Sequence, residues 1–484
     1  MHLTVAARLA PATRRSDLLR ALQAPEIGPF VLLLLAAGAF YLAPWPPVYG
    51  PALLAFALLT WLRPELALGV IVAFAPLFMV PKHIGSKEFA PSEIFLLIDA
   101  GVVYLYAISP ARRSLLRWRA LLASPLFPPL LLFLVAAGVS TLFAADQAEA
   151  FRAFREVILE PSLFFVLLLL QLSRSSQWRS LVLTLVLTGV ALGMVSLVQL
   201  ATHQNLSIAP GSSIDRVRAF YGSPDNLGLF YDRVVPMWLS ITLLGLQKPS
   251  WRIASWLAGI VLLPTLFLTY SRGAWAAIAI GALLILVLVF RRGRWLAVTA
   301  IVLAVAAGLV GGPKLAHALR AGHSNTVQTR LDLWRSSARM IRNHPLIGVG
   351  PDNFLHYYAP TRRQDLWQRI CAPGLGYMEP GAGAEPCLSH PHNVVLDFWL
   401  STGILGLLAF LWLQASYWRM AAHAWRRWRG TPNGALALGA MAAMVAALAH
   451  GLVDNSYFLV DLAIVFWLLC GLISFLARVE HADP

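Results

Sequence analysis

The sequence predicts an all-α fold, a polytopic bundle of transmembrane helices, and three observations lead to this prediction. First, 58% of the 484 residues are hydrophobic and only 13% are charged, whereas a soluble domain carries roughly 25% charged residues. Second, the mean hydropathy of the whole chain is +0.67. Third, apolar stretches near the length that crosses a bilayer recur along the chain. A secreted disulfide scaffold, a disordered protein and a soluble nucleic-acid binder are thereby excluded.

The apolar stretches divide into long and short ones. The long ones cover residues 28–44, 92–108, 125–144, 179–201, 230–247, 252–270, 272–290, 295–312, 394–417, 434–452 and 456–477. The short ones cover residues 51–62, 66–80 and 161–173. A pair of short stretches can be left out without changing the side on which any later loop lies. The prediction is therefore a bundle of 12–14 spans.

Basic residues predict the side of the membrane on which each loop lies, because Lys and Arg accumulate in cytoplasmic loops. With a cytoplasmic N-terminus, five basic clusters fall on the cytoplasmic side. They are Arg112/Arg113/Arg117/Arg119, Arg174/Arg179, Lys248/Arg252, Arg291/Arg292/Arg294 and Arg419/Arg426/Arg427/Arg429. Both termini are expected in the cytoplasm, and the polar residues 1–27 form a cytoplasmic head rather than a cleaved signal peptide.

The outer face is expected to receive one dominant loop, residues 313–393, and several short segments. These segments are residues 81–91, 145–160, 202–229, 271–272 and 453–455. The domains are then a bundle at 28–312, the loop domain at 313–393, helices at 394–477 and a cytoplasmic tail at 478–484. A loop of this length is usually functional.

Within this loop, residues 330–343 have helical spacing, and His344-Pro345 ends the predicted helix. Its apolar stripe is expected to consist of Leu331, Trp334, Ala338 and Ile341, and to lie on the membrane surface or to cap the bundle.

The basic excess of the chain consists almost entirely of arginine. The formal net charge is +15 and all but four of the 38 basic residues are Arg. Guanidinium groups bind phosphate and carboxylate in a bidentate manner, so the excess indicates an anionic substrate; a GC-rich genome is an equally good explanation. The arginines in short outer segments run against the usual distribution of charge and predict a negative partner. They are Arg152, Arg155, Arg216, Arg218 and Arg272.

The strongest catalytic candidate is Ser389-His390-Pro391-His392-Asn393, where the outer loop enters the span that begins at residue 394. A histidine at a membrane–water boundary can act as a general base near neutral pH. The alternative is that His392 or Asn393 only caps the incoming helix. Arg272 lies at the start of another outer helix, where backbone donors and a guanidinium together bind anions. The alternative for Arg272 is an interaction with lipid headgroups.

No motif for a metal or nucleotide cofactor occurs in the sequence, and neither a cofactor nor a divalent metal is expected. The outer loops lack the closely spaced carboxylates that hold a metal between phosphates. Asp225, Asp397 and Asp454 lie far apart in the chain, so only the fold could bring them into one metal site.

Several of these motifs occur in the order typical of one known family. They are Arg330-x-x-x-Trp334, Asn343-His-Pro345-Leu-Ile-Gly348-Val-Gly350-Pro-Asp-Asn353-Phe354, and His392-Asn393 with Gly403-x-x-Gly406. Together they resemble the Wzy_C signature of the O-antigen ligase and polymerase superfamily. Phe220-x-Gly222-Ser-Pro-Asp-Asn226 and Ser271-Arg272-Gly273 are similar to its companion motifs.

The resemblance implies a GT-C-like glycosyltransferase of the bacterial inner membrane. Its partners would be membrane lipids, a glycan donor on undecaprenyl diphosphate and a lipid A core acceptor, with no nucleic acid. The active site would face the periplasm. A single dominant outer loop late in the chain favours a ligase over an O-antigen polymerase. The short C-terminal tail disfavours a protein O-oligosaccharyltransferase. A transporter of lipid-linked sugars would instead place its polar groups near the bilayer midplane.

The resemblance also implies roles for single residues. His392 takes the proton from an acceptor hydroxyl, which attacks the anomeric carbon with inversion, and Asn393 orients the histidine or the acceptor. The residues implied in holding the diphosphate are Arg218, Arg272, Arg155 and Arg152. Further candidates are Arg330, His390 and Asp397. Cys371 and Cys387 would lie in the oxidising periplasm, so a disulfide between them is expected.

Overall fold

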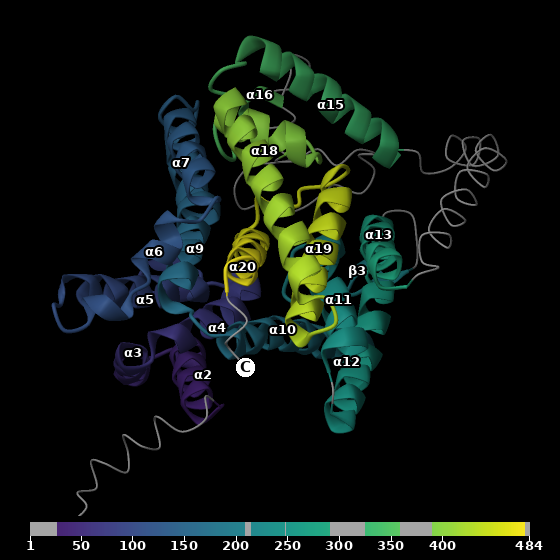
Figure 1. Cartoon of the computed structure of the whole chain (residues 1–484). Coiled ribbons are helices and arrows are strands. Elements are labelled where there is room, and N and C mark those ends of the chain that lie inside the picture. The colour runs from purple at the N-terminus through teal and green to yellow at the C-terminus, as the bar shows by residue number, and fades with distance from the viewer. Residues whose placement is uncertain (1–26, 209–213, 247, 291–324, 359–389, 480–484) are drawn as a thin grey trace, which may run out of the picture.

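The computed structural model describes residues 27–208, 214–246, 248–290, 325–358 and 390–479 (Figure 1). In this part of the chain, seven helices are long and apolar enough to cross a membrane. They are α5 (Pro91–Ile108), α10 (Ser175–Thr202), α11 with its following π-turn (Pro224–Gly245), α12 (Pro249–Leu268), α13 (Arg272–Val289), α18 (Val394–Trp428) and α19 (Pro432–Gly451). The prediction of an all-α multi-pass membrane protein is confirmed.

Shorter helices complete the bundle. The apolar ones are α2 (Ile27–Leu42), α3 (Pro46–Leu62), α4 (Pro64–Phe74), α7 (Phe127–Leu142), α9 (Glu160–Gln171) and α20 (Val460–Leu476). The others are α6 (Trp118–Leu122), α8 (Gln147–Ala153), α15 (Asn325–Asn343) and α16 (Phe354–Tyr358). Two small antiparallel ribbons, β1–β2 (Lys82–Ile84, Lys87–Phe89) and β3–β4 (Ser207–Ile208, Asp215–Arg216), are the strands of the described residues.

The centre of the bundle is α20, which lies between α9, α18 and α19 (Figure 1). Every residue of this helix is buried, so its apolar composition serves packing against other helices rather than contact with lipid. Trp467 stacks obliquely on Phe165 of α9, with ring centroids 4.9 Å apart. Burial of such rings is the main stabilising contribution that side chains make to a packed core.

Segments that join the helices contact other parts of the chain at both ends of the bundle. Asp146 bonds Asn353, and Arg216 of strand β4 donates to the carbonyl of Thr269. Arg117 donates to the carbonyl of Leu172, and Ser124 bonds Ser474. The side of the membrane on which each end lies stays a prediction.

The helix α18 is broken at Gly403, and the turn after α15 fills the break. Gly403 has φ 69° and ψ −177°, a conformation that only glycine adopts readily. The amide of Ile404 donates to the carbonyl of Leu346 (3.2 Å), and the amide of Val349 donates to the carbonyl of Leu400 (2.7 Å). Gly348, with φ 74°, lies against Leu400 so closely that a Cβ would overlap its carbonyl. The two glycine motifs are therefore one structural unit.

Gly403→Ala is expected to lower the thermal stability of the protein. An alanine at this φ and ψ is strained by about 1–3 kcal/mol, and its Cβ would overlap the carbonyl oxygen of Leu346. Thermal unfolding of the purified protein in detergent measures the effect. The matched control is Gly38→Ala in α2, where a Cβ meets no atom within 4 Å. Equal midpoints for the two variants would contradict this account of the helix break.

Residues 330–343 form the C-terminal part of α15, as predicted, and this helix crosses the end of the bundle at which α18 begins (Figure 1). Two members of the predicted apolar stripe, Leu331 and Ala338, are exposed. The buried face consists instead of Leu333, Ser336, Ser337 and Met340. Leu333 and Met340 pack with Val349, Phe354 and Leu400 in one hydrophobic cluster, and this cluster attaches α15 to the bundle.

Candidate functional site

The candidate site is built on the loop that enters α18. Asn393 is the N-cap of this helix, and its side-chain oxygen accepts hydrogen bonds from the amides of Val395 and Leu396, both at 3.1 Å. Asparagine is among the best residues for this position. The Asn393 amide group also donates to the carbonyl of Leu452 at 3.0 Å. Asn393 thus joins the start of α18 to the turn between α19 and α20.

This junction places His392 beside Asp454. His392 Nδ1 lies 2.7 Å from Asp454 Oδ1, and the side chains are only 15% and 10% exposed. Burial alone would raise the pKa of Asp454, but the hydrogen bond from His392 and the nearby imidazoles hold this pKa at about 2. The carboxylate is therefore ionised at neutral pH and fixes the proton of His392 on Nδ1.

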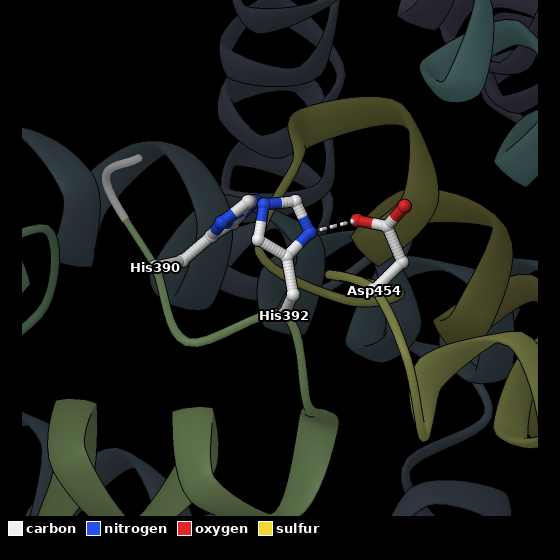
Figure 2. Close-up of side chains that lie close together, drawn as sticks. All are labelled: His390, His392 and Asp454. Atoms are coloured by element: carbon white, nitrogen blue, oxygen red, sulfur yellow. Dashed lines mark hydrogen bonds and ion pairs between the residues drawn. The ribbon is translucent and has the colours of Figure 1, made fainter. Parts of the chain in front are cut away.

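The second nitrogen of His392 points toward His390 rather than toward Asp454, so the His392 ring lies between the two residues (Figure 2). The two imidazole centroids are 4.3 Å apart. His392 Nε2 and His390 Nδ1 are both buried and have no hydrogen-bond partner in the described part of the chain. Burial, reinforced by His392, lowers the pKa of His390 to about 3, so His390 is neutral and a weak base.

The same three residues offer metal-ligand atoms. One atom each of His390, His392 and Asp454 lies within 4.8 Å of the others. Two imidazoles and a carboxylate are a donor set that transition metals accept. The sequence did not reveal this grouping, because the histidines and the aspartate come from different segments.

A second histidine–carboxylate pair lies behind the first. His450 of α19 places Nδ1 2.7 Å from Asp232 Oδ2 of α11, and its Nε2 is 3.9 Å from Asp454 Oδ2. Both side chains of this pair are fully or almost fully buried. Asp454 therefore lies between two histidines. The signal that could have found these residues is the presence of ionisable groups within or beside apolar helices, which is uncommon unless they have a function.

The helix α13 begins against this second pair. A Cβ on Gly273 would overlap the imidazole of His450, so the glycine in Ser271-Arg272-Gly273 permits the close approach. Arg272 is the first residue of α13 and is exposed. Its guanidinium has no ion pair or hydrogen bond with any described residue. The start of a helix combined with an unpaired guanidinium is a favourable place for an anion.

Arg218 is held differently. Its Nε donates to the carbonyl of Asn205 at 3.0 Å, and its Nη1 donates to the carbonyl of Tyr221 at 3.1 Å. Both acceptors are neutral, so the positive charge of Arg218 is not compensated by them. These two bonds order the segment before α11 and leave the second terminal nitrogen of Arg218 available.

Arg152 and Arg155 have carboxylate partners within the protein. Arg155 contacts Glu93 and lies 2.9 Å from Glu156 and 3.0 Å from Glu160. Arg152 lies 3.5 Å from Asp352. The negative partners predicted for these two arginines are therefore carboxylates of the protein itself.

The remaining candidates lie apart from this group. Asp397 is buried in the first turn of α18 and accepts a hydrogen bond from Ser401 at 3.3 Å, not from His392. Arg330 lies on α15 and is partly buried. Cys371 and Cys387 lie outside the described residues, and Cys470 is a free, buried cysteine of α20.

These features define a class of protein: a polytopic helical membrane protein with a histidine–aspartate site at one end of its bundle. Comparison with known families makes the assignment more specific. Residues 257–411 match the family described as O-antigen ligase, Wzy_C. This part of the chain is therefore similar to the O-antigen ligase family, as its motifs predicted. The match includes His392 and Arg272, whereas Asp454 lies beyond it. No curated protein matches the chain.

Proposed function

We propose that this protein is an O-antigen ligase of the bacterial inner membrane. It moves a glycan from undecaprenyl diphosphate to the lipid A core at the periplasmic face, with both termini in the cytoplasm. The observation that carries the proposal is the buried His392–Asp454 pair at the end of the bundle, beside the helix start that bears Arg272. A base and a site for a departing diphosphate are the two elements that this transfer needs.

In the proposed reaction, Asp454 and His392 have separate roles. Asp454 keeps the His392 proton on Nδ1, which leaves the Nε2 lone pair to accept the proton of an acceptor sugar hydroxyl. The hydroxyl oxygen forms the new bond to the anomeric carbon as the bond from that carbon to the diphosphate oxygen breaks, with inversion. Asp454 then stabilises the imidazolium. Because His390 covers Nε2 in this structure, the acceptor must displace that ring.

The leaving diphosphate carries negative charge that must be offset. In the proposal, the Arg272 guanidinium and the first amides of α13 take this role, together with the uncompensated charge of Arg218. Arg152 and Arg155 are already paired with carboxylates, so they support the proposal by ordering the outer segments rather than by contacting phosphate.

Purified protein tests the proposal directly. Transfer of a lipid-linked glycan is followed with two acceptors in parallel, the lipid A core and a second lipid-linked repeat unit. Transfer to the core alone supports the ligase. Transfer to the repeat unit alone would make the protein a polymerase. Movement of the donor across a vesicle membrane without bond exchange would make it a transporter.

Arg272→Lys is expected to lose most of the transfer activity although the charge is kept. Lysine cannot make the bidentate contact that a guanidinium makes with phosphate. Arg218→Lys is expected to lose activity as well, since the single nitrogen of lysine cannot replace both Nε and Nη1, which bond two separate carbonyls, and also reach a phosphate. Initial rates at saturating acceptor measure both effects. Full activity in both lysine variants would mean that these arginines only anchor the protein to lipid headgroups.

Transfer is expected to proceed in excess EDTA, because arginine is permanently charged and can take the place of a cation. The rate of the EDTA-treated protein, relative to untreated protein, is the measurement. Loss of activity that Mg²⁺, Mn²⁺ or Zn²⁺ restores would contradict the metal-independent mechanism. In that case the grouping of His390, His392 and Asp454 becomes the metal site, and His390→Ala should weaken the response to the metal.

A further inference from the structure

At the opposite end of the bundle lies a cavity that the proposed transfer does not use. Its volume is about 1140 Å³, above the 300–1,000 Å³ typical of ligand pockets. It is lined by the end of α5, the start of α6, the end of α9, the first turns of α10 and the end of α20. Figure 1 shows α5, α6 and α9 side by side in this region, near the C-terminal end of the described chain.

The lining of this cavity combines basic and apolar side chains. No Asp or Glu is among the lining residues. Four arginines line the cavity: Arg113, Arg117, Arg119 and Arg478. None of the four forms an ion pair with a carboxylate within the described chain. The apolar walls are made by side chains such as Leu116, Leu169 and Phe475. We call this cavity the basic pocket.

Two of the arginines are fixed in place by bonds to helix ends. Arg117 donates to the carbonyl of Leu172 at 2.8 Å, and Arg478 donates to the carbonyls of Ser474 (2.9 Å) and Ala120. Burial and the nearby charge of Arg117 both lower the pKa of Arg478. Two guanidinium groups held close together without a counter-ion gain from an anion that lies between them.

The rim of the basic pocket resembles a membrane interface. Trp118 is 41% exposed and Leu115 is 61% exposed, and tryptophan is enriched where a bundle meets the headgroup region. The charge distribution predicts that this rim lies in the cytoplasmic leaflet, where anionic lipids are abundant. A ligand that enters here is thus more readily supplied by the bilayer than by the solvent.

We propose that the basic pocket binds the phosphate headgroup of an anionic phospholipid, with the upper part of its acyl chains against the apolar wall. The four arginines contact the phosphate oxygens, and the apolar side chains exclude water from the glycerol and the first methylenes. This inference does not rest on the proposed glycan transfer, because no residue of the pocket belongs to the histidine–aspartate site.

The test uses the full chain, purified in a neutral detergent and stripped of lipid. Cardiolipin, phosphatidylglycerol and phosphatidylcholine are each titrated, and native mass spectrometry measures the bound fraction. The variant is Arg113→Gln with Arg119→Gln, because these two side chains make no hydrogen bond to another described residue. The control is Arg426→Gln with Arg429→Gln, two exposed arginines of the same predicted face that lie outside the pocket.

The expected result is retention of anionic lipid by the wild type and by the control, and affinity weaker by about tenfold or more in the pocket variant. Equal weakening in the control would overturn the proposal in favour of diffuse attraction to a basic surface. Equal binding of phosphatidylcholine would overturn the requirement for charge. Displacement of the lipid by millimolar inorganic phosphate would assign the pocket to a free phosphate instead. If the double variant fails to fold, Arg119→Gln alone is compared with the wild type and with the control in the same titrations. Arg119 is exposed.

Discussion

Replacement of His392 is expected to abolish glycan transfer, whereas replacement of His390 is expected to have a milder effect. This result is expected because, of these two histidines, only His392 has a carboxylate on one nitrogen and a free lone pair on the other. A general base typically accelerates a reaction by 10²–10⁴-fold. The low pKa of His390, about 3, makes it a poor acceptor of a hydroxyl proton. Initial transfer rates of the purified variants are the measurement.

The choice of substitution matters at this position. His392 has φ 48°, and asparagine tolerates this left-handed conformation better than alanine does. His392→Asn therefore separates the loss of the base from backbone strain, and His392→Ala is its companion. Unchanged expression and thermal midpoint control for folding. Transfer above about a tenth of the wild-type rate in His392→Asn would rule out the general base, and a larger loss in His390→Ala would transfer the role to His390.

Asp454→Asn is expected to reduce the turnover rate by about 10³–10⁴-fold with little change in the Michaelis constant. In the serine-protease triad the equivalent change costs about 10⁴-fold, because the amide favours the wrong histidine tautomer. Here the amide that replaces the carboxylate could likewise donate to His392 Nδ1, which would leave the proton on Nε2. The geometry of the loop should persist, since Asn393 still bonds the carbonyl of Leu452.

The pH dependence gives an independent check of the Asp454 role. The pKa of Asp454 is lowered to about 2 from its ordinary value of 3.8. The stabilisation of the His392–Asp454 pair by this carboxylate is therefore complete above pH 4 and is lost only as the pH falls through 2. Transfer between pH 5 and 8 should show no step from Asp454.

The control for Asp454 is Asp397→Asn, another buried acid at the same end of α18. Asp397 bonds Ser401 and does not contact His392. A loss in Asp397→Asn as large as that in Asp454→Asn would show that burial of the carboxylate, and not its contact with the histidine, determines the rate.

Most of the helices could be predicted from the sequence. The predicted span 92–108 corresponds to α5 (Pro91–Ile108), and 272–290 corresponds to α13 (Arg272–Val289). The helix α18 continues to Trp428, beyond the predicted end at 417. The additional turns carry Arg426 and Arg427. The predicted span ends where the sequence stops being apolar, whereas the helix itself continues through these charged residues.

The partners of the charged residues could not be predicted. Arg155 meets Glu93, which is 62 residues away in the chain, and His392 meets Asp454 at the same separation. The sequence marks each residue as unusual in its segment, but it does not state which segments adjoin. Arg155 and Arg272 therefore looked alike in the sequence, and only the structure shows the first paired with carboxylates and the second exposed at a helix start.

The sequence by itself determined the class of this protein, the position of most spans and the similarity of residues 257–411 to the O-antigen ligase family, and it singled out His392 as the candidate base. These properties depend on local composition and on short motifs, which are read residue by residue. The tertiary structure decided that Asn393 is a helix cap, that Gly348 and Gly403 form one junction, and that Asp454 lies between His392 and His450. Such pairings arise when helices that are distant in the sequence pack together and their buried polar groups form hydrogen bonds with each other. A local sequence pattern does not show which helix will supply the partner.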